Sequence, residues 1–259
     1  MIIVWLPKVH HRYSAAGIHF LSSLSVVALL VGILLFFWFP DPYFSASGGW
    51  QGLRLVAGVD LVLGPLLTFI VFNPQKTARE LAVDLGIIVL IQVSALVWGI
   101  RAIYEQRPVA VVYLDTSFYT VPAKALQAQG IAPDSLEIFG DSRPVFVMSR
   151  QPATTEEWQR FETLMTEEQI PPHEQVWLYQ PLAEHFSEIA GSTLDVDVVM
   201  EGNPDMRREI ERVLEKIGAE KDALVYLALT SRYRNVLLIF DKQGTLKGTV
   251  NAPYKTGEV

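Results

Sequence analysis

Cysteine is absent from the 259 residues, and charged residues are scarce, at 19%. Without cysteine the chain has no disulfide framework, no cysteine-ligated zinc ribbon and no thiol nucleophile. Cations are also in the minority, with 21 Lys and Arg against 28 Asp and Glu, and a net charge of -7 excludes a protein that coats nucleic acid. A mean hydropathy of +0.26 with so little charge excludes a disordered chain.

Charge is distributed unevenly along the sequence. The first hundred residues carry five cations and four carboxylates, whereas the remaining residues carry 16 cations and 24 carboxylates. The hydrophobic excess therefore lies in the N-terminal part, and the rest has the composition of an acidic, water-soluble domain.

Three apolar runs in the N-terminal part are candidate membrane spans. The run at 15–39 is about 25 residues long, enough to cross a hydrocarbon core of about 30 Å, and its aromatic end followed by Pro40 distinguishes it from a cleavable signal peptide. The runs at 55–72 and 85–103 are shorter, so a buried helix of a soluble protein is the alternative for each. Their position directly behind a longer span favours three transmembrane helices.

The basic residues of the connecting segments indicate the orientation in the membrane. Four of them precede the first run or lie between the second and third: Lys8, Arg12, Lys76 and Arg79. Three others lie between the first two runs or flank the exit of the third: Arg54, Arg101 and Arg107. The positive-inside rule then places the N-terminus in the cytoplasm and everything after the third run outside it, in the periplasm of a bacterium with two membranes.

Polar residues interrupt two of the runs. Asp60 costs several kcal/mol in hydrocarbon unless it faces protein, water or a cation, so its presence requires a partner. Asp60, Gly64 and Thr68 share one face of the second helix. On the third helix a stripe of polar and small residues recurs at spacings of three and four: Asp84, Ile88, Gln92, Ala95 and Gly99.

Three interpretations of these polar residues remain open. The first is packing within the three helices, with Arg101 pairing with Asp60 toward the outer leaflet and His19 lying near Asp84 toward the inner leaflet. The second is a docking seam for a transmembrane helix of another protein. The third is a proton or ion path, although three spans with one central carboxylate are sparse for a transporter and no inverted repeat is visible.

The sequence after Arg107-Pro108 has the pattern of an α+β domain. Strands are predicted at 109–114, 144–148, 176–179, 224–229, 236–240 and 246–250, and helices at 154–165 and 203–217. Asp195-Val196-Asp197 alternates as a strand does, which places both carboxylates on one solvated face. We therefore predict a membrane protein with three transmembrane α-helices, at about 15–39, 55–72 and 85–103 of a membrane domain at 1–104, followed by an extracytoplasmic soluble α+β domain at 105–259.

Catalytic and metal-binding signals are absent from the sequence. There is no Gly-rich loop ending in Gly-Lys-Ser/Thr, no His-Glu-x-x-His and no Gly-x-Ser-x-Gly. His173 and His185 are expected at the surface or in capping positions, and Asp195 with Asp197 is too few oxygen ligands for calcium. We predict no catalytic residue, no metal and no cofactor.

The second run carries a motif that resembles a known family. Residues 57–68 read AGVDLVLGPLLT and residues 71–76 read VFNPQK, which is similar to the signature of the inner-membrane type IV pilin accessory proteins of the TfpX/TfpZ type. Three further features agree, namely the entry Gly17-Ile18-His19, the exit Trp38-Phe39-Pro40 and the Arg107-Pro108 close of the third run. The resemblance extends over residues 17–112.

This resemblance implies an inner-membrane protein without enzymatic activity that assists the production, stability or assembly of a specific type IV pilin. It implies as partners a major or minor pilin, other pilus-assembly proteins and membrane lipid, but no nucleic acid. A pilin awaiting assembly is held in the same membrane by an apolar N-terminal helix with its globular head outside, so the second and third spans are expected to contact that helix and the acidic domain to contact the head. The residues expected to serve helix packing or pilin contact are Gly58, Asp60, Gly64, Pro65, Thr68, Asp84 and Gln92, with His19 and Arg101 as intramembrane partners.

Two alternatives belong to other functional classes. The first is a membrane-anchored sensor or scaffold whose external domain binds a small ligand or a cell-wall component. The second is an ion-coupled or enzymatic membrane protein, in which Asp60→Asn abolishes function while the abundance of the protein stays unchanged.

Overall fold

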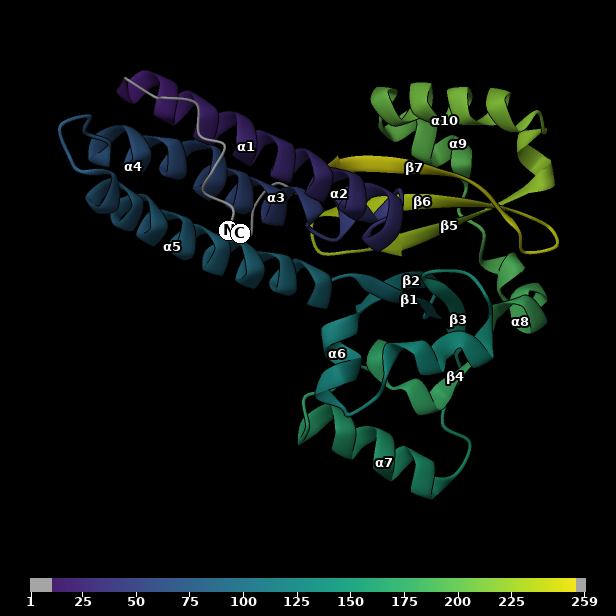
Figure 1. Cartoon of the computed structure of the whole chain (residues 1–259). Coiled ribbons are helices and arrows are strands. Elements are labelled where there is room, and N and C mark those ends of the chain that lie inside the picture. Colours follow the sequence, from purple (N-terminus) through teal and green to yellow (C-terminus); the bar gives the residue numbers. More distant parts are fainter. Residues whose placement is uncertain (1–10, 255–259) are drawn as a thin grey trace. The chain divides into compact units, whose positions relative to one another are not determined.

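The computed structural model describes residues 11–254, and the chain divides into two compact units (Figure 1). The three-helix unit consists of Met1–Pro40 and Gly49–Tyr104, and the sheet unit consists of Asp41–Gly48 and Glu105–Val259. Lys8, one of the cations that indicated the orientation, lies outside the described residues.

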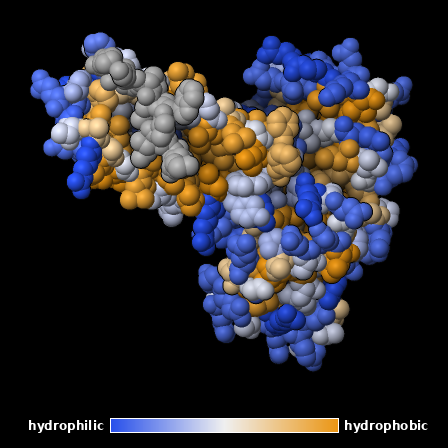
Figure 2. Space-filling view, in the orientation of Figure 1, coloured by the Kyte–Doolittle hydropathy of each residue, from blue (hydrophilic) through white to orange (hydrophobic). Residues whose placement is uncertain are grey.

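Three helical segments are long and apolar enough to cross a membrane. The first is α1 (Arg12–Ile33), continued by a π-turn at Leu34–Trp38; the second joins α3 (Gly49–Ala57), a π-turn at Gly58–Leu63 and α4 (Gly64–Val71); the third is α5 (Ala78–Glu105). Large apolar side chains are exposed along all three, among them Leu29, Phe36, Leu66, Leu90 and Trp98. Figure 2 shows the resulting apolar surface, which suits contact with lipid and not with water.

The second and third helices begin earlier than the apolar runs predicted, at Gly49 and Ala78. A capping box sets the start of α5, because the Thr77 N–H donates to the Glu80 carboxylate at 2.9 Å and the Glu80 N–H donates to Thr77 Oγ1 at 3.3 Å. In the second helix Pro65 has no N–H to donate to the preceding turn, and the π-turn directly before α4 accommodates the break.

Seven strands of the sheet unit form one mixed sheet in the order β4-β3-β1-β2-β5-β6-β7. β1 runs parallel to β3 and β2 runs parallel to β5, whereas the other neighbours are antiparallel. The strands are β1 (Pro108–Leu114), β2 (Ser117–Pro122), β3 (Val145–Ser149), β4 (Tyr179–Pro181), β5 (Leu224–Thr230), β6 (Arg234–Asp241) and β7 (Leu246–Tyr254).

Helices cover both faces of this sheet. On one face α8 (Leu182–Ile189) packs Phe186 and Ile189 against Leu227 and Phe240. On the other face α9 (Val196–Gly202) and α10 (Pro204–Ile217) cover the β5–β7 side, and α6 (Ala123–Ala128) covers the β1–β3 side. α7 (Thr155–Thr166) buries no residue. Three membrane-length helices followed by this α+β unit confirm the predicted fold class.

The segment between the first two membrane helices folds with the sheet unit. It contains the short helix α2 (Tyr43–Ala46), whose Tyr43 and Ala46 are 3% and 0% exposed in the cluster that also holds Leu238. The Tyr233 N–H donates to the Ala46 carbonyl at 3.2 Å, and the Ser231 hydroxyl donates to the same oxygen at 2.7 Å. Residues 41–48 thus contribute to the sheet unit's core, whereas the sequence-based boundary at 104 assigned them to the membrane domain.

Two local predictions in the sheet unit were wrong. The strand predicted at 176–179 is a 3₁₀ helix at Val176–Leu178, and β4 begins only at Tyr179. Asp195 and Asp197 do not share a strand face, because Asp195 is the N-cap of α9 and accepts hydrogen bonds from the N–H groups of Asp197 and Val198 at 3.0 and 3.3 Å. The Asp197 carboxylate accepts from Lys221 Nζ at 2.7 Å. An Asp that precedes a short apolar segment is as typical of a helix start as of an alternating strand.

Candidate functional site

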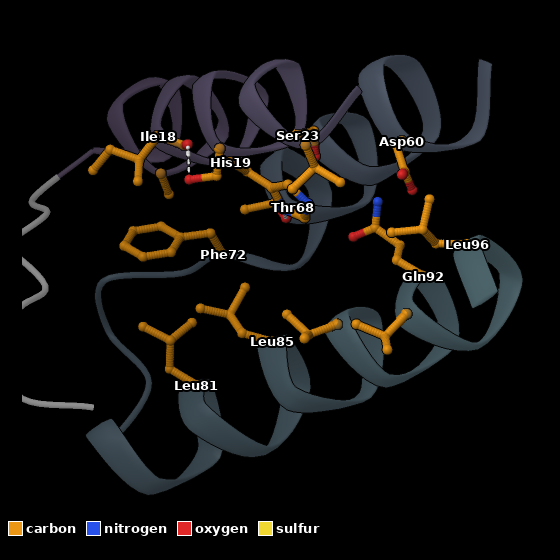
Figure 3. A pocket seen from close by; sticks show the side chains of 15 residues that line it. Ile18, His19, Ser23, Asp60, Thr68, Phe72, Leu81, Leu85, Gln92 and Leu96 are labelled. Carbon is orange, nitrogen blue, oxygen red and sulfur yellow. Dashed lines mark hydrogen bonds between the residues drawn. The ribbon is translucent and has the colours of Figure 1, made fainter. Parts of the chain in front are cut away.

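The predicted intramembrane residues meet at a cavity of about 610 Å³ inside the three-helix unit (Figure 3). α1 contributes His19 and Ser23 to its lining, the second helix contributes Asp60 and Thr68, and α5 contributes Gln92. Most of the remaining lining is apolar and includes Ile18, Val26, Phe72, Leu81, Leu85, Val89, Val93 and Leu96. The three helices therefore surround a cavity whose wall is mostly apolar and carries a few polar side chains.

Asp60 and Gln92 occupy the middle of this membrane unit. Asp60 is residue 12 of the 23 in the second helix, and Gln92 is residue 15 of the 28 in the third. Their exposed fractions are only 5% and 8%, and Figure 3 shows the two side chains pointing toward each other. Gln92 Nε2 is buried without a hydrogen-bond partner. Within residues 11–254 the Asp60 carboxylate likewise has no hydrogen bond or salt bridge, so the pair retains unused hydrogen-bonding capacity.

His19 and Asp84 have partners other than the predicted ones. His19 Nδ1 lies 2.6 Å from Thr68 Oγ1, which links α1 to α4. Asp84 instead pairs with Lys76, with 2.5 Å between Oδ2 and Nζ, near the start of α5. Arg101 follows Gln92 by nine residues, roughly 13 Å along the helix, and does not line the cavity. The structure therefore replaces the expected pairs His19–Asp84 and Asp60–Arg101 with His19–Thr68 and Lys76–Asp84.

Glycines of the second and third helices mark their closest approach. A Cβ added to Gly64 would overlap the Gln92 amide, and one added to Gly99 would lie 2.9 Å from Val56 Cγ2. The stripe predicted on α5 supplies the buried face of that helix, with Ile88, Gln92 and Gly99 inside. Asp60, Gly64 and Thr68 are buried on one face of the second helix, whereas Gly58 is exposed with no atom within 4 Å of an added Cβ. These contacts favour packing within the unit as the role of the stripe.

The histidines of the sheet unit are separate from each other. The His173 ring stacks on Tyr119 with 5.0 Å between centroids, and its burial lowers the pKa of the imidazole. His185 Nδ1 lies 2.7 Å from Glu188 Oε1. No group of three or more His, Cys, Asp and Glu residues that could hold a metal ion occurs in the part of the chain that the structure describes.

An ionic cluster at the start of α7 was not predicted. The Arg150 guanidinium donates to both carboxylate oxygens of Glu157, at 2.7 and 2.9 Å, and the Ala153 N–H donates at 2.8 Å. These bonds lower the pKa of Glu157 from its usual 4.5 to about 2. The Arg160 guanidinium lies 4.6 Å from the Trp177 ring centroid. The cluster holds the start of α7 against the preceding loop through charge-assisted hydrogen bonds, which is a structural role.

Comparison with known proteins identifies the family. Residues 7–48 match the profile of the family described as Fimbrial assembly protein FimB. Over 98 residues the chain is 49% identical to the fimbrial assembly protein of serogroups C1 and C2 from Dichelobacter nodosus, a match that covers 38% of this chain and 75% of that protein. This chain belongs to the fimbrial assembly protein family.

Two further members of the family come from the same bacterium. The fimbrial assembly proteins of serogroups I and E1 are 49% and 46% identical to this chain over 98 residues, with 38% of each relative covered. No solved structure shows a significant match to the chain. Membership in the fimbrial assembly family confirms the family resemblance that the motif at 57–76 indicated.

Proposed function

We propose that this protein is a non-enzymatic accessory protein that assists the production, stability or assembly of a specific type IV pilin at the bacterial inner membrane. The observation that carries the proposal is the family match at 7–48, which covers the first membrane helix and the segment that folds with the sheet unit. A protein that presents both a membrane helix bundle and a folded head suits a partner that also has both parts.

The proposed topology has the N-terminus in the cytoplasm and the sheet unit in the periplasm. The connection between α4 and α5 and the first turn of α5 carry Lys76 and Arg79, which supports a cytoplasmic position for them. Three spans necessarily place residues 41–48 and the residues after α5 on the same side of the membrane. The inclusion of residues 41–48 in the sheet unit agrees with this requirement.

The proposed contacts follow from this topology. The membrane helices meet the apolar helix of the pilin within the bilayer, and the acidic sheet unit meets the pilin head in the periplasm. The residues after Ile100 carry 16 cations and 24 carboxylates, so charge complementarity is available to a basic surface on the head.

Deletion of the gene tests the proposal in the bacterium that carries it. We expect the deletion strain to lose surface pili, seen by electron microscopy, and to regain them when the intact chain is supplied from a plasmid. Immunoblots for pilin separate the steps: a fall in pilin indicates a role in production or stability, and unchanged pilin without surface pili indicates a role in assembly. Unchanged piliation together with unchanged pilin would show that the proposal is wrong.

A further inference from the structure

The cavity of the three-helix unit has a polar centre that its own residues leave unsatisfied. Gln92 Nε2 has no hydrogen-bond partner although the residue is only 8% exposed. Asp60, at 5% exposure, faces it across the cavity. An unused N–H and an unused carboxylate in hydrocarbon are costly, so a group that serves both would bind there favourably.

The depth of this centre distinguishes between the occupants that a membrane offers. Asp60 and Gln92 lie midway along helices of 23 and 28 residues, and therefore near the centre of the hydrocarbon. The polar groups of a lipid lie at the two interfaces, so a lipid would present only its apolar tail at this depth. A transmembrane helix can carry a polar side chain at its middle, and interhelical hydrogen bonds of this kind stabilise helix association.

The cavity also opens sideways. Val26 on α1, and Val89 and Val93 on α5, line the cavity and are nevertheless 43%, 51% and 50% exposed. These residues form the rim of an opening between α1 and α5. A volume of about 610 Å³ is the size of a small-ligand pocket, whereas a helix is about 10 Å across. A helix would therefore rest against the rim and fill the cavity with side chains of one face.

We propose that this cavity is the seat of the pilin's transmembrane helix. The helix lies between α1 and α5, and a hydroxyl or amide side chain at its middle accepts a hydrogen bond from Gln92 and donates one to Asp60. The inference rests on the proposed function, and it specifies which surface of the membrane unit holds the pilin. Other residues of the α5 stripe, such as Gly99 against Val56, serve packing within the unit instead.

Adjacent positions on α5 provide a matched crosslinking test. A photo-crosslinking amino acid replaces Val89, which lines the cavity, or Leu90, which is 67% exposed and does not line it. Val26 and Leu29 form the same contrast on α1. The full chain is expressed in cells that make pili, and the adducts are identified by immunoblotting for pilin. We expect pilin adducts at Val89 and Val26, and none at Leu90 or Leu29.

A variant of the polar centre tests the recognition itself. Gln92→Leu, combined with the crosslinker at Val89, is expected to reduce the pilin adduct about threefold, the effect of an average interhelical hydrogen bond in a membrane. The adduct is normalised to the amount of the protein in the membrane, so a change in abundance does not imitate the effect. An undiminished adduct would overturn the role assigned to Gln92.

The outcomes separate this inference from the proposed function. If pili require the protein but Val89 yields adducts only with lipid, only with a second copy of the chain, or equally with Leu90, the seat is wrong and the accessory role stands. If deletion leaves pilin and pili unchanged, the proposed function is wrong, and the proposed binding site for the pilin helix is then wrong as well.

Discussion

Replacing Tyr43 tests whether the segment between the first two membrane helices stabilises the sheet unit. Tyr43 is 3% exposed in the cluster that contains Leu227, Leu238 and Phe240. Truncation of a buried aromatic side chain to alanine costs about 3–5 kcal/mol, a large share of the 5–15 kcal/mol by which a domain is stable. We therefore expect Tyr43→Ala to lower the free energy of unfolding of the sheet unit by about 3–5 kcal/mol.

Tyr43→Phe should behave in the opposite way. The Tyr43 hydroxyl is buried without a hydrogen-bond partner, and burial, with a further contribution from the Asp41 carboxylate, raises the pKa of Tyr43 well above its usual value. Removing an unsatisfied buried hydroxyl relieves a desolvation cost of about 1–3 kcal/mol while the ring stays in place. We expect Tyr43→Phe to leave the free energy of unfolding unchanged or to raise it by about 1 kcal/mol.

Pulse proteolysis of the full chain in detergent, over a series of urea concentrations, measures both variants on the fragment that carries the sheet. Ile138→Ala is the control, because Ile138 belongs to the same unit and is 79% exposed. A loss of less than about 1 kcal/mol for Tyr43→Ala would refute the assignment of residues 41–48 to the core of the sheet unit.

Three other predictions concern packing, pH and the central carboxylate. Gly64→Leu forces a side chain against the Gln92 amide at an overpacking cost of about 1–3 kcal/mol, so immunoblots of membranes should show less of this variant. Gly58→Leu is the control and should leave the level unchanged, and equal levels of the two variants would contradict the packing of Gly64 against Gln92. Hydrogen bonding to Arg150 lowers the pKa of Glu157 to about 2, so the stability that Glu157 contributes is complete above pH 4.5 and is lost as the pH falls toward 2. In an acid titration followed by circular dichroism, Glu157→Gln should abolish this part of the loss, and an unchanged titration would argue against the Arg150–Glu157 pair. Asp60→Asn keeps hydrogen-bonding groups and removes the cost of burying a charge, so abundance and piliation should persist; lost piliation at unchanged abundance would indicate a proton or ion path instead.

Hydropathy predicts the three membrane helices because a long apolar segment in lipid forms a helix, in which its backbone N–H and C=O groups hydrogen-bond to each other. The starts of the second and third helices were placed too late, since their first turns contain polar residues such as Gln51 and Arg79. The capping box Thr77-Ala78-Arg79-Glu80 is present in the sequence and identifies the start of α5.

Local signals explain most of the sheet unit as well. The helices predicted at 154–165 and 203–217 begin with Thr154 and Asn203, which are the N-caps of α7 and α10, because their side chains accept hydrogen bonds from N–H groups in the first turn of each helix. β2 was not predicted, since the β1–β2 turn consists of Asp115 and Thr116 at φ values of 46° and 73°. Glycine or asparagine is the usual signal for such a turn, and neither residue is present there.

The candidate site was predictable in its faces but not in its partners. A spacing of four places Asp60, Gly64 and Thr68 on one side of a helix, and the structure buries all three. The residue opposite each of them depends on helix tilt and rotation, which packing against neighbours sets and the sequence period does not. For that reason His19 contacts Thr68 and not Asp84.

Cysteine accessibility tests the central claim, that the sheet unit lies outside the cytoplasm where a pilin head can be reached. The native chain has no cysteine, so a single introduced thiol reports one position. The variants are Glu167→Cys and Gln75→Cys, because Glu167 is exposed on the sheet unit and Gln75 is exposed between α4 and α5. With a membrane-impermeant maleimide on intact spheroplasts, we predict labelling of E167C at once and of Q75C only after permeabilisation. Labelling of Q75C but not E167C in intact spheroplasts would place the sheet unit in the cytoplasm and contradict the account.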